Sequence, residues 1–149
     1  MKTPKILPPV YLLLYLLIAL ALHRWMPIVW VVPQSLRLFG VVPLVAGFLL
    51  LSWGATLFKT KGTAIKPFEP STTLVTQGPY RFTRNPMYLG AITFLTGIAI
   101  MLGSLAAFVA PVAMFVTLQR IFIPAEEAMM EQTFGQAYRD FKQRVRRWI

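Results

Sequence analysis

Long apolar segments are the feature that most constrains the fold of this chain. Residues 36–58 include a single charged side chain and are long enough to cross the ~30 Å hydrocarbon core of a bilayer. Charged residues make up only 13% of the chain, whereas soluble domains carry about 25%. We therefore predict an all-α integral membrane protein that forms a single domain over residues 1–149. About four transmembrane helices are expected, at residues 10–32, 36–58, 88–102 and 104–123.

The first apolar segment has a second interpretation. Lys2 and Lys5 precede it, and the small residues around Ala21 resemble the cleavage site of a secretory signal peptide. We expect the segment to be retained as a span. The other three spans have the same topology under either interpretation.

Lysine and arginine residues concentrate in the loop between the second and third spans and in the C-terminal tail. Such residues mark cytoplasmic loops, so we predict that both termini and this loop share the cytoplasmic side, with the inner membrane of a bacterium as the expected location. Anionic lipid headgroups then explain the net charge of +10 better than nucleic acid does. The chain has no cysteine and one histidine, His23, so we predict no metal site.

Glycines recur every seven residues in the second span, at Gly40, Gly47 and Gly54, and in the third, at Gly90 and Gly97. This spacing places them along one stripe of each helix. Small residues let membrane helices approach closely, so the pattern predicts tight helix packing.

Residues 77–90 form a basic, aromatic, turn-rich segment that leads into the third span. Counting equally from a turn at residues 103–104 places Arg81 level with Glu126, so this segment and Glu126-Glu127 are expected to converge at one membrane edge. The basic segment and the acidic pair each also have a simpler interpretation. Pro124 can begin a new helix whose first turn the acidic pair stabilises, and the arginines can be ordinary cytoplasmic-loop residues.

The chain after Pro124 has helical periodicity, and we predict an amphipathic helix over about residues 125–147. Such a helix either lies in the membrane interface or packs over a cytoplasmic site. Gly135 within it is expected to mark either a kink or a close approach to a bound group. Its apolar face carries Met130, Phe134, Tyr138, Phe141, Val145 and Trp148.

The motifs at residues 78–90, 123–127, 134–138 and 145–147 together resemble the isoprenylcysteine carboxyl methyltransferase family, which is related to phospholipid N-methyltransferases. The resemblance covers the chain from Thr72 onward, and the first two spans match only in hydropathy and length. It implies a membrane enzyme that transfers a methyl group from S-adenosylmethionine to a lipid or lipophilic small acceptor at the cytoplasmic membrane edge.

The resemblance also implies which residues bind the cofactor. They are Thr72, Thr73, Leu74, Val75, Tyr80, Asn85, Pro86, Met87, Tyr88 and Glu126. Asn85 stands where the carboxyl methyltransferases have histidine, and it keeps a donor and an acceptor but cannot titrate.

Arg120 and Glu127 are the candidate catalytic residues. Family members with a prenylcysteine substrate have arginine where this chain has Phe122, and Arg120 is the nearest arginine. Two alternatives follow: Arg120 binds the carboxylate of the acceptor, or the acceptor is a different lipid. Glu127 is either a partner of neighbouring site residues or a residue that stabilises the helix dipole.

Two other functions remain open from sequence. The chain could be a membrane reductase that binds a nicotinamide dinucleotide on a similar helical scaffold. It could also be a non-catalytic membrane module whose basic tail binds anionic lipid. The combined motifs favour the methyltransferase.

Overall fold

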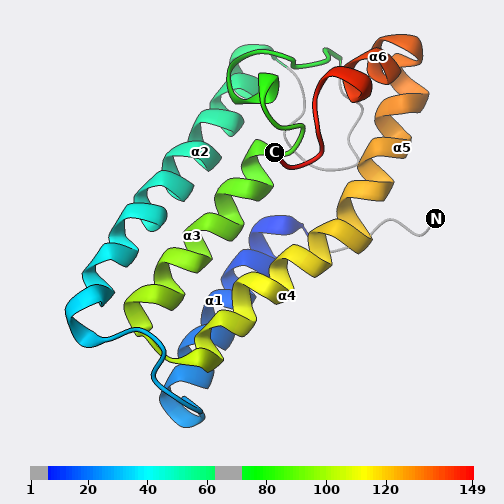
Figure 1. The fold of residues 1–149 in the computed structure, drawn as a ribbon. Coiled ribbons are helices and arrows are strands. Elements are labelled where there is room, and N and C mark those ends of the chain that lie inside the picture. Colours follow the sequence, from blue (N-terminus) through cyan, green and yellow to red (C-terminus); the bar gives the residue numbers. More distant parts are fainter. Residues whose placement is uncertain (1–6, 63–71) are drawn as a thin grey trace.

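The computed structural model describes residues 7–62 and 72–149, and most of these residues are helical (Figure 1). A 3-10 helix, Gln34–Gly40, precedes α2, and another, Leu105–Phe108, precedes α4. The α-helices are α1 (Pro8–Trp25), α2 (Val41–Thr60), α3 (Pro86–Leu102), α4 (Val109–Thr117), α5 (Ile123–Phe134) and α6 (Gln136–Arg144).

Three helical runs in the described residues are long and apolar enough to cross a membrane. They are Pro8–Trp25, Gln34–Thr60 and Leu105–Phe134, and the shorter apolar helix Pro86–Leu102 lies among them. The prediction of an all-α integral membrane protein is confirmed.

The first helix ends earlier than predicted. The expected span reached residue 32, but α1 ends at Trp25 and residues 26–33 form a loop. Pro27 explains the difference, because a proline disfavours the helical conformation of the residue before it. Ile28, with φ of 63°, then turns the chain further from helical geometry.

The fourth span is longer than predicted and does not end at Pro124. A π-helical turn, Leu118–Phe122, joins α4 to α5, so the helix runs on to Phe134. In a regular α-helix the ring of a proline meets the carbonyl four residues earlier. The wider π turn directly before Pro124 relieves this clash, which is why the chain continues as a helix there.

Gly135 divides the predicted helix 125–147 into α5 and α6. Its φ of 53° and ψ of −122° are a conformation that residues with a side chain rarely adopt. Of the two alternatives expected for Gly135, the kink is present, and it is a complete helix break.

Helices α2 and α3 pack backbone against backbone at their glycines. A Cβ atom added to Gly47 would lie 2.6 Å from the carbonyl oxygen of Gly90, and one added to Gly90 would lie 2.7 Å from that of Gly47. Gly40 and Gly97 are related in the same way. The predicted tight packing is thus a direct contact between glycines of the two helices.

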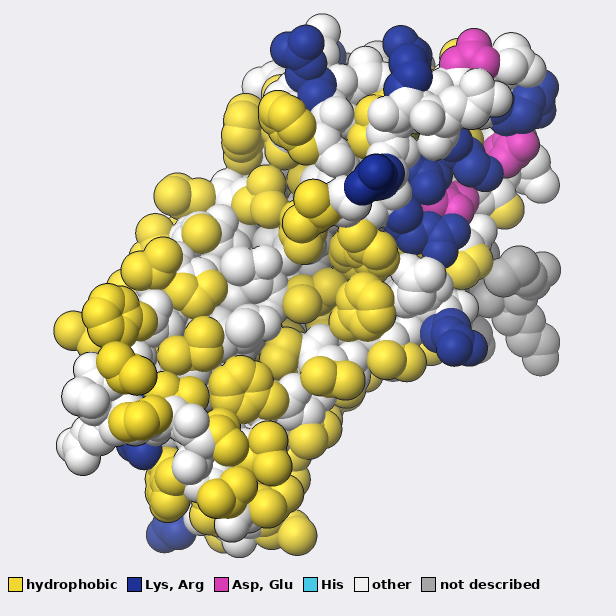
Figure 2. Space-filling view, viewed as in Figure 1, with side chains coloured by type: hydrophobic (Ala, Val, Ile, Leu, Met, Phe, Trp, Pro, Cys, Tyr) yellow, Lys and Arg dark blue, Asp and Glu magenta, His cyan; other side chains and the backbone are white. Residues whose placement is uncertain are grey.

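The two ends of the bundle differ in their side chains. The start of α1, the end of α2, the start of α3 and helix α6 lie at one end, whereas the α1–α2 and α3–α4 connections lie at the other (Figure 1). Figure 2 shows apolar side chains over most of one face, with acidic and many basic residues gathered around α5 and α6. Helix α3 and the α4–α5 run diverge toward this polar end.

Candidate functional site

A cavity of about 350 Å³ lies where α3 and the α4–α5 run diverge. The starts of α1 and α3, the second half of α2, and helices α4, α5 and α6 contribute its walls, most of which are apolar. Its polar lining residues are Tyr80, Arg84, Asn85, Tyr88, Glu126, Glu127 and Tyr138.

The turn before α3 places two of these residues. Gly78 has a φ of 59°, and the 3-10 helix Gly78–Arg81 that begins there turns Tyr80 into the protein, where it is 5% exposed. Asn85 is the N-cap residue of α3, and its backbone N–H donates a hydrogen bond to the Thr83 hydroxyl at 3.1 Å. Pro86 occupies the first turn of the helix, where its missing N–H costs nothing.

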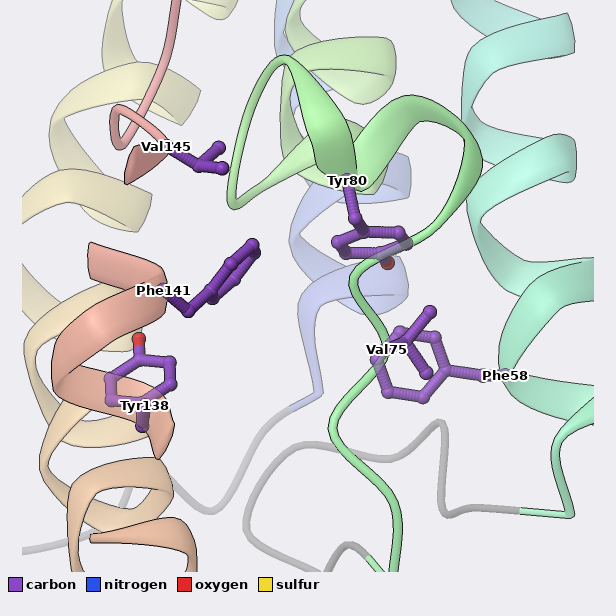
Figure 3. Packing of buried hydrophobic residues seen from close by; sticks show 6 residues of the cluster. All are labelled: Phe58, Val75, Tyr80, Tyr138, Phe141 and Val145. Atoms are coloured by element: carbon purple, nitrogen blue, oxygen red, sulfur yellow. The ribbon is translucent and has the colours of Figure 1, made fainter. Parts of the chain in front are cut away.

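Apolar and aromatic side chains from distant parts of the chain form one wall (Figure 3). The rings of Phe58 and Tyr80 lie 5.5 Å apart between centroids, and Tyr138 and Phe141 of α6 lie across from them. The apolar face of α6 thus packs over the cavity, which is one of the two placements expected for it. The buried cluster consists of Phe58, Val75, Tyr80, Tyr138, Phe141 and Val145.

The Tyr80 hydroxyl is buried, and no residue in the described part of the chain hydrogen-bonds to it. Burial, and then the charge of Glu126, raises its pKa far above the usual value, so the hydroxyl stays neutral. An unpaired buried polar group costs about 1–3 kcal/mol. Tyr80 is therefore a candidate to bind a polar atom of a ligand in the cavity.

Glu126 lies beside Tyr80 in the same cavity. The hydroxyl of Tyr88 donates a hydrogen bond to Glu126 Oε1 across the gap between α3 and α5. This bond orients the carboxylate, whose remaining acceptor positions suit a hydroxyl or amine of a ligand.

Glu127 is held by two arginines. Arg84 Nη1 lies 2.8 Å from Glu127 Oε1, while Arg147 donates from Nε to Oε1 at 3.1 Å and from Nη2 to Oε2 at 2.6 Å. The Glu127 side chain is only 13% exposed, and paired charges with two parallel bonds are favourable in such surroundings. Both carboxylate oxygens are thus occupied by arginine.

The structure brings together most of the predicted site residues. The cavity is lined by Leu74, Val75, Tyr80, Asn85, Met87, Tyr88, Glu126 and Glu127. Pro86 is fully buried and does not line the cavity. Thr72 and Thr73 are exposed and do not line the cavity.

Arg120 lies apart from the other predicted site residues. Its side chain is exposed on the π-helical turn and does not line the cavity. Phe122, two residues later, is completely buried. Because residues two apart lie on nearly opposite sides of a helix, the burial of Phe122 directs Arg120 away from the interior.

The predicted site residues did not include Phe58, Arg84, Tyr138, Phe141 and Arg147, which line the cavity or hold its lining residues in place. Arg84 stands inside the basic, aromatic segment and could have been found there. Arg147 falls in the motif at residues 145–147, but its contact with Glu127 depends on how the C-terminal tail folds back over the site.

Comparison with known proteins agrees with this geometry. A sequence model of the phospholipid methyltransferase family matches residues 36–137, so the match includes the second span and the part of the site before Tyr138. A probable protein-S-isoprenylcysteine O-methyltransferase of Oryza sativa is 35% identical over 81 residues, which are 52% of this chain and 41% of that protein. An uncharacterized protein of Haemophilus influenzae is 33% identical over 63 residues, which are 42% of this chain and all of that protein.

The fold is also similar to a solved structure. The eukaryotic intramembrane Ras methyltransferase, an isoprenylcysteine carboxyl methyltransferase, superimposes with a TM-score of 0.65 at 23% identity over 92% of this chain and 50% of that one. The chain therefore spans half or less of the isoprenylcysteine methyltransferases that it matches here. The matched family model, the sequence relatives and the shared fold together show that this chain belongs to the phospholipid methyltransferase family, among membrane proteins similar to isoprenylcysteine carboxyl methyltransferases.

Proposed function

We propose that this protein transfers a methyl group from S-adenosylmethionine to a lipid or lipophilic small molecule at the cytoplasmic edge of the membrane. The cavity carries this proposal, because one space is lined both by polar groups, including the Tyr80 hydroxyl that lacks a hydrogen-bond partner among the described residues, and by apolar side chains of the membrane-length helices. A polar cofactor and an apolar acceptor need these two surroundings side by side.

The residues that line the polar part suit this cofactor. The unpaired hydroxyl of Tyr80 and the carboxylate of Glu126 offer a hydrogen-bond donor and an acceptor to its ribose, amino and adenine groups. Phe58 and Phe141 offer apolar ring surface to the adenine. When bound, the cofactor would supply a methyl group carried on a positively charged sulfur.

The acceptor is assigned to the apolar part of the cavity. Leu12 of α1, Leu51 of α2, and Ala91 and Met114 on α3 and α4 line this part. All four lie within helical runs that are apolar enough to lie in the bilayer, so an apolar chain could reach the cavity without crossing water.

The chain would contribute chiefly alignment and the exclusion of water. Holding two reactants in a productive geometry can lower a barrier by up to roughly 7–11 kcal/mol. Glu127 would act by holding Arg84, since arginines occupy both of its oxygens. In the described part of the chain, Arg84 is the only cationic side chain that lines the cavity, so it is the candidate contact for an anionic group of either ligand.

A methyl-transfer assay tests the proposal. The purified protein would be placed in liposomes of the expression host's total lipid and incubated with methyl-labelled S-adenosylmethionine. We expect label in the lipid extract, a large reduction in the Glu126→Gln variant, and no change in Arg144→Gln, which alters an exposed side chain of α6. If the liposomes transfer no label but oxidise an added nicotinamide dinucleotide, the protein is a reductase. If they do neither, it is a non-catalytic membrane module.

A further inference from the structure

The C-terminal residues 145–149, which we term the C-terminal clasp, fold back onto the start of α3 (Figure 1). The backbone N–H of Arg84 donates to the carbonyl of Arg146 at 3.0 Å. The hydroxyl of Thr83 and the side-chain amide of Asn85 both donate to the carbonyl of Arg147, at 3.1 and 3.0 Å. Three consecutive residues before α3 are therefore bound to two consecutive carbonyls of the clasp.

The clasp also binds the opposite wall of the cavity. The guanidinium of Arg147 makes two hydrogen bonds to Glu127 of α5. The indole of Trp148 donates to Gln119 at 2.9 Å, and its ring lies 5.2 Å from that of Phe115. A single short segment thus connects the start of α3 with the α4–α5 run, although α3 and this run diverge at the cavity.

The contact with the clasp determines which way the Asn85 amide faces. A carbonyl can only accept, so the NH2 group of Asn85, rather than its oxygen, must face Arg147. The amide oxygen is then turned away from the clasp. Asn85 lines the cavity, and no hydrogen bond to its side-chain oxygen is found within residues 7–62 and 72–149.

We propose that Arg147 is a positioning residue of the site, acting through its side chain and its backbone together. The side chain fixes Glu127, and through it Arg84, while the backbone carbonyl fixes Asn85 with its amide oxygen presented to the cavity. Asn85 then accepts a hydrogen bond from an ammonium or hydroxyl group of the bound cofactor. This inference rests on the proposed function, since it assigns a contact to the same cofactor.

Calorimetric titration with S-adenosylhomocysteine tests the role of the Arg147 side chain. We expect Arg147→Gln to weaken binding about tenfold, the loss expected for charged hydrogen bonds, and Arg147→Lys to restore part of it. Arg146→Gln is the matched control, because it removes the same charge from an adjacent exposed side chain. Equal affinities in Arg147→Gln and the wild type, or equal losses in Arg147→Gln and Arg146→Gln, would overturn the proposal.

Two variants of Asn85 test the role of the backbone carbonyl, even where Arg147→Gln folds poorly. A neutral histidine also has one donor and one acceptor, so Asn85→His should bind within about threefold of the wild type. Asn85→Asp loses the donor and opposes the carbonyl with a charged acceptor, so it should bind at least about tenfold more weakly. Asn85→Asp binding as tightly as the wild type would contradict this assignment. A wild-type protein that binds no S-adenosylhomocysteine would instead contradict the proposed function.

Discussion

Helix α3 is held at its middle and at its start by opposite means. At its middle, Gly90 and Gly97 lie directly against the backbone of α2, with no side chain between the two helices. At its start, Tyr88 and the residues before it are held by hydrogen bonds to side chains and carbonyls from α5 and the C-terminal clasp. One region depends on shape and the other on polar partners.

The difference follows from the surroundings of each region. Inside a bilayer the lipid tails are as apolar as the helices, so close contact between small residues is a main source of helix association. At the polar end, each buried charge or amide must find a partner, and a change that keeps the hydrogen-bonding pattern is tolerated. The fold should therefore be most sensitive at the glycines, and ligand binding most sensitive at the polar end.

Gly47→Leu should have the largest effect on the fold. A Cβ atom there would lie 2.4 Å from the backbone nitrogen of Phe94, which cannot move without displacing α3. We expect a loss of more than about 3 kcal/mol in the free energy of unfolding, or no folded protein at all. Thermal unfolding in detergent measures the loss of stability. Ala46→Leu is the control, because Ala46 is exposed on the same helix. Equal stability of the two variants would show that α2 and α3 do not pack through their glycines.

Glu127→Gln should have the next largest effect. It removes the charged partner that Arg84 and Arg147 share, and it leaves these two cations close together. Arg84 is the one that lines the cavity. We expect the unfolding free energy to fall by about 2–3 kcal/mol. Denaturant unfolding measures the loss, and Glu131→Gln, whose ion pairs are more exposed, is the control. Similar losses in both variants would mean that burial adds nothing to the Glu127 pairs.

Tyr80→Phe should separate binding from stability. The hydroxyl lacks a partner among the described residues, so its removal should leave the unfolding free energy unchanged or raise it by up to about 1 kcal/mol. The same change should weaken binding of S-adenosylhomocysteine by about 1 kcal/mol, because the hydroxyl would be paired only in the complex. Tyr138→Phe is the comparison variant, because it also removes a neutral tyrosine hydroxyl. Burial and the charge of Glu127 raise the pKa of Tyr138 to about 12. Unchanged affinity in Tyr80→Phe would remove that hydroxyl from the proposed site.

Arg120→Gln should have the smallest effect. The side chain is exposed and lies outside the cavity, so binding and stability should both stay within about 0.5 kcal/mol of the wild type. A marked loss of methyl transfer in this variant would restore the catalytic role predicted for Arg120. It would also require the acceptor to extend beyond the cavity.

Hydropathy and turn residues predicted the helices well, because apolar length is what a bilayer requires of a chain. The errors occurred at prolines. Pro27 ends α1 early, whereas Pro124 fails to end a helix because a π turn precedes it. The first error follows from a local rule, but the second depends on a rare backbone geometry that sequence does not reveal.

The meeting of the basic, aromatic segment with the acidic pair was predicted by counting from the turn, but the exact partners were not. Counting placed Arg81 level with Glu126, yet the residue that hydrogen-bonds to Glu126 is Tyr88, seven residues after Arg81. Equal counting assumes parallel helices, whereas α3 and the α4–α5 run diverge, so a given residue of α3 meets a later residue of α5. The contacts of Arg147 arise only when the tail folds back, and no periodic pattern encodes that.

Titration of the purified protein with S-adenosylhomocysteine tests whether the polar end of the cavity binds S-adenosylmethionine. A nicotinamide dinucleotide serves as the control ligand, and the Glu126→Gln variant is titrated in parallel. We expect saturable binding of S-adenosylhomocysteine alone, weakened by roughly 1–3 kcal/mol in the variant. Binding of neither ligand by folded protein, or equal affinity in the Glu126→Gln variant, would overturn the proposed cofactor site.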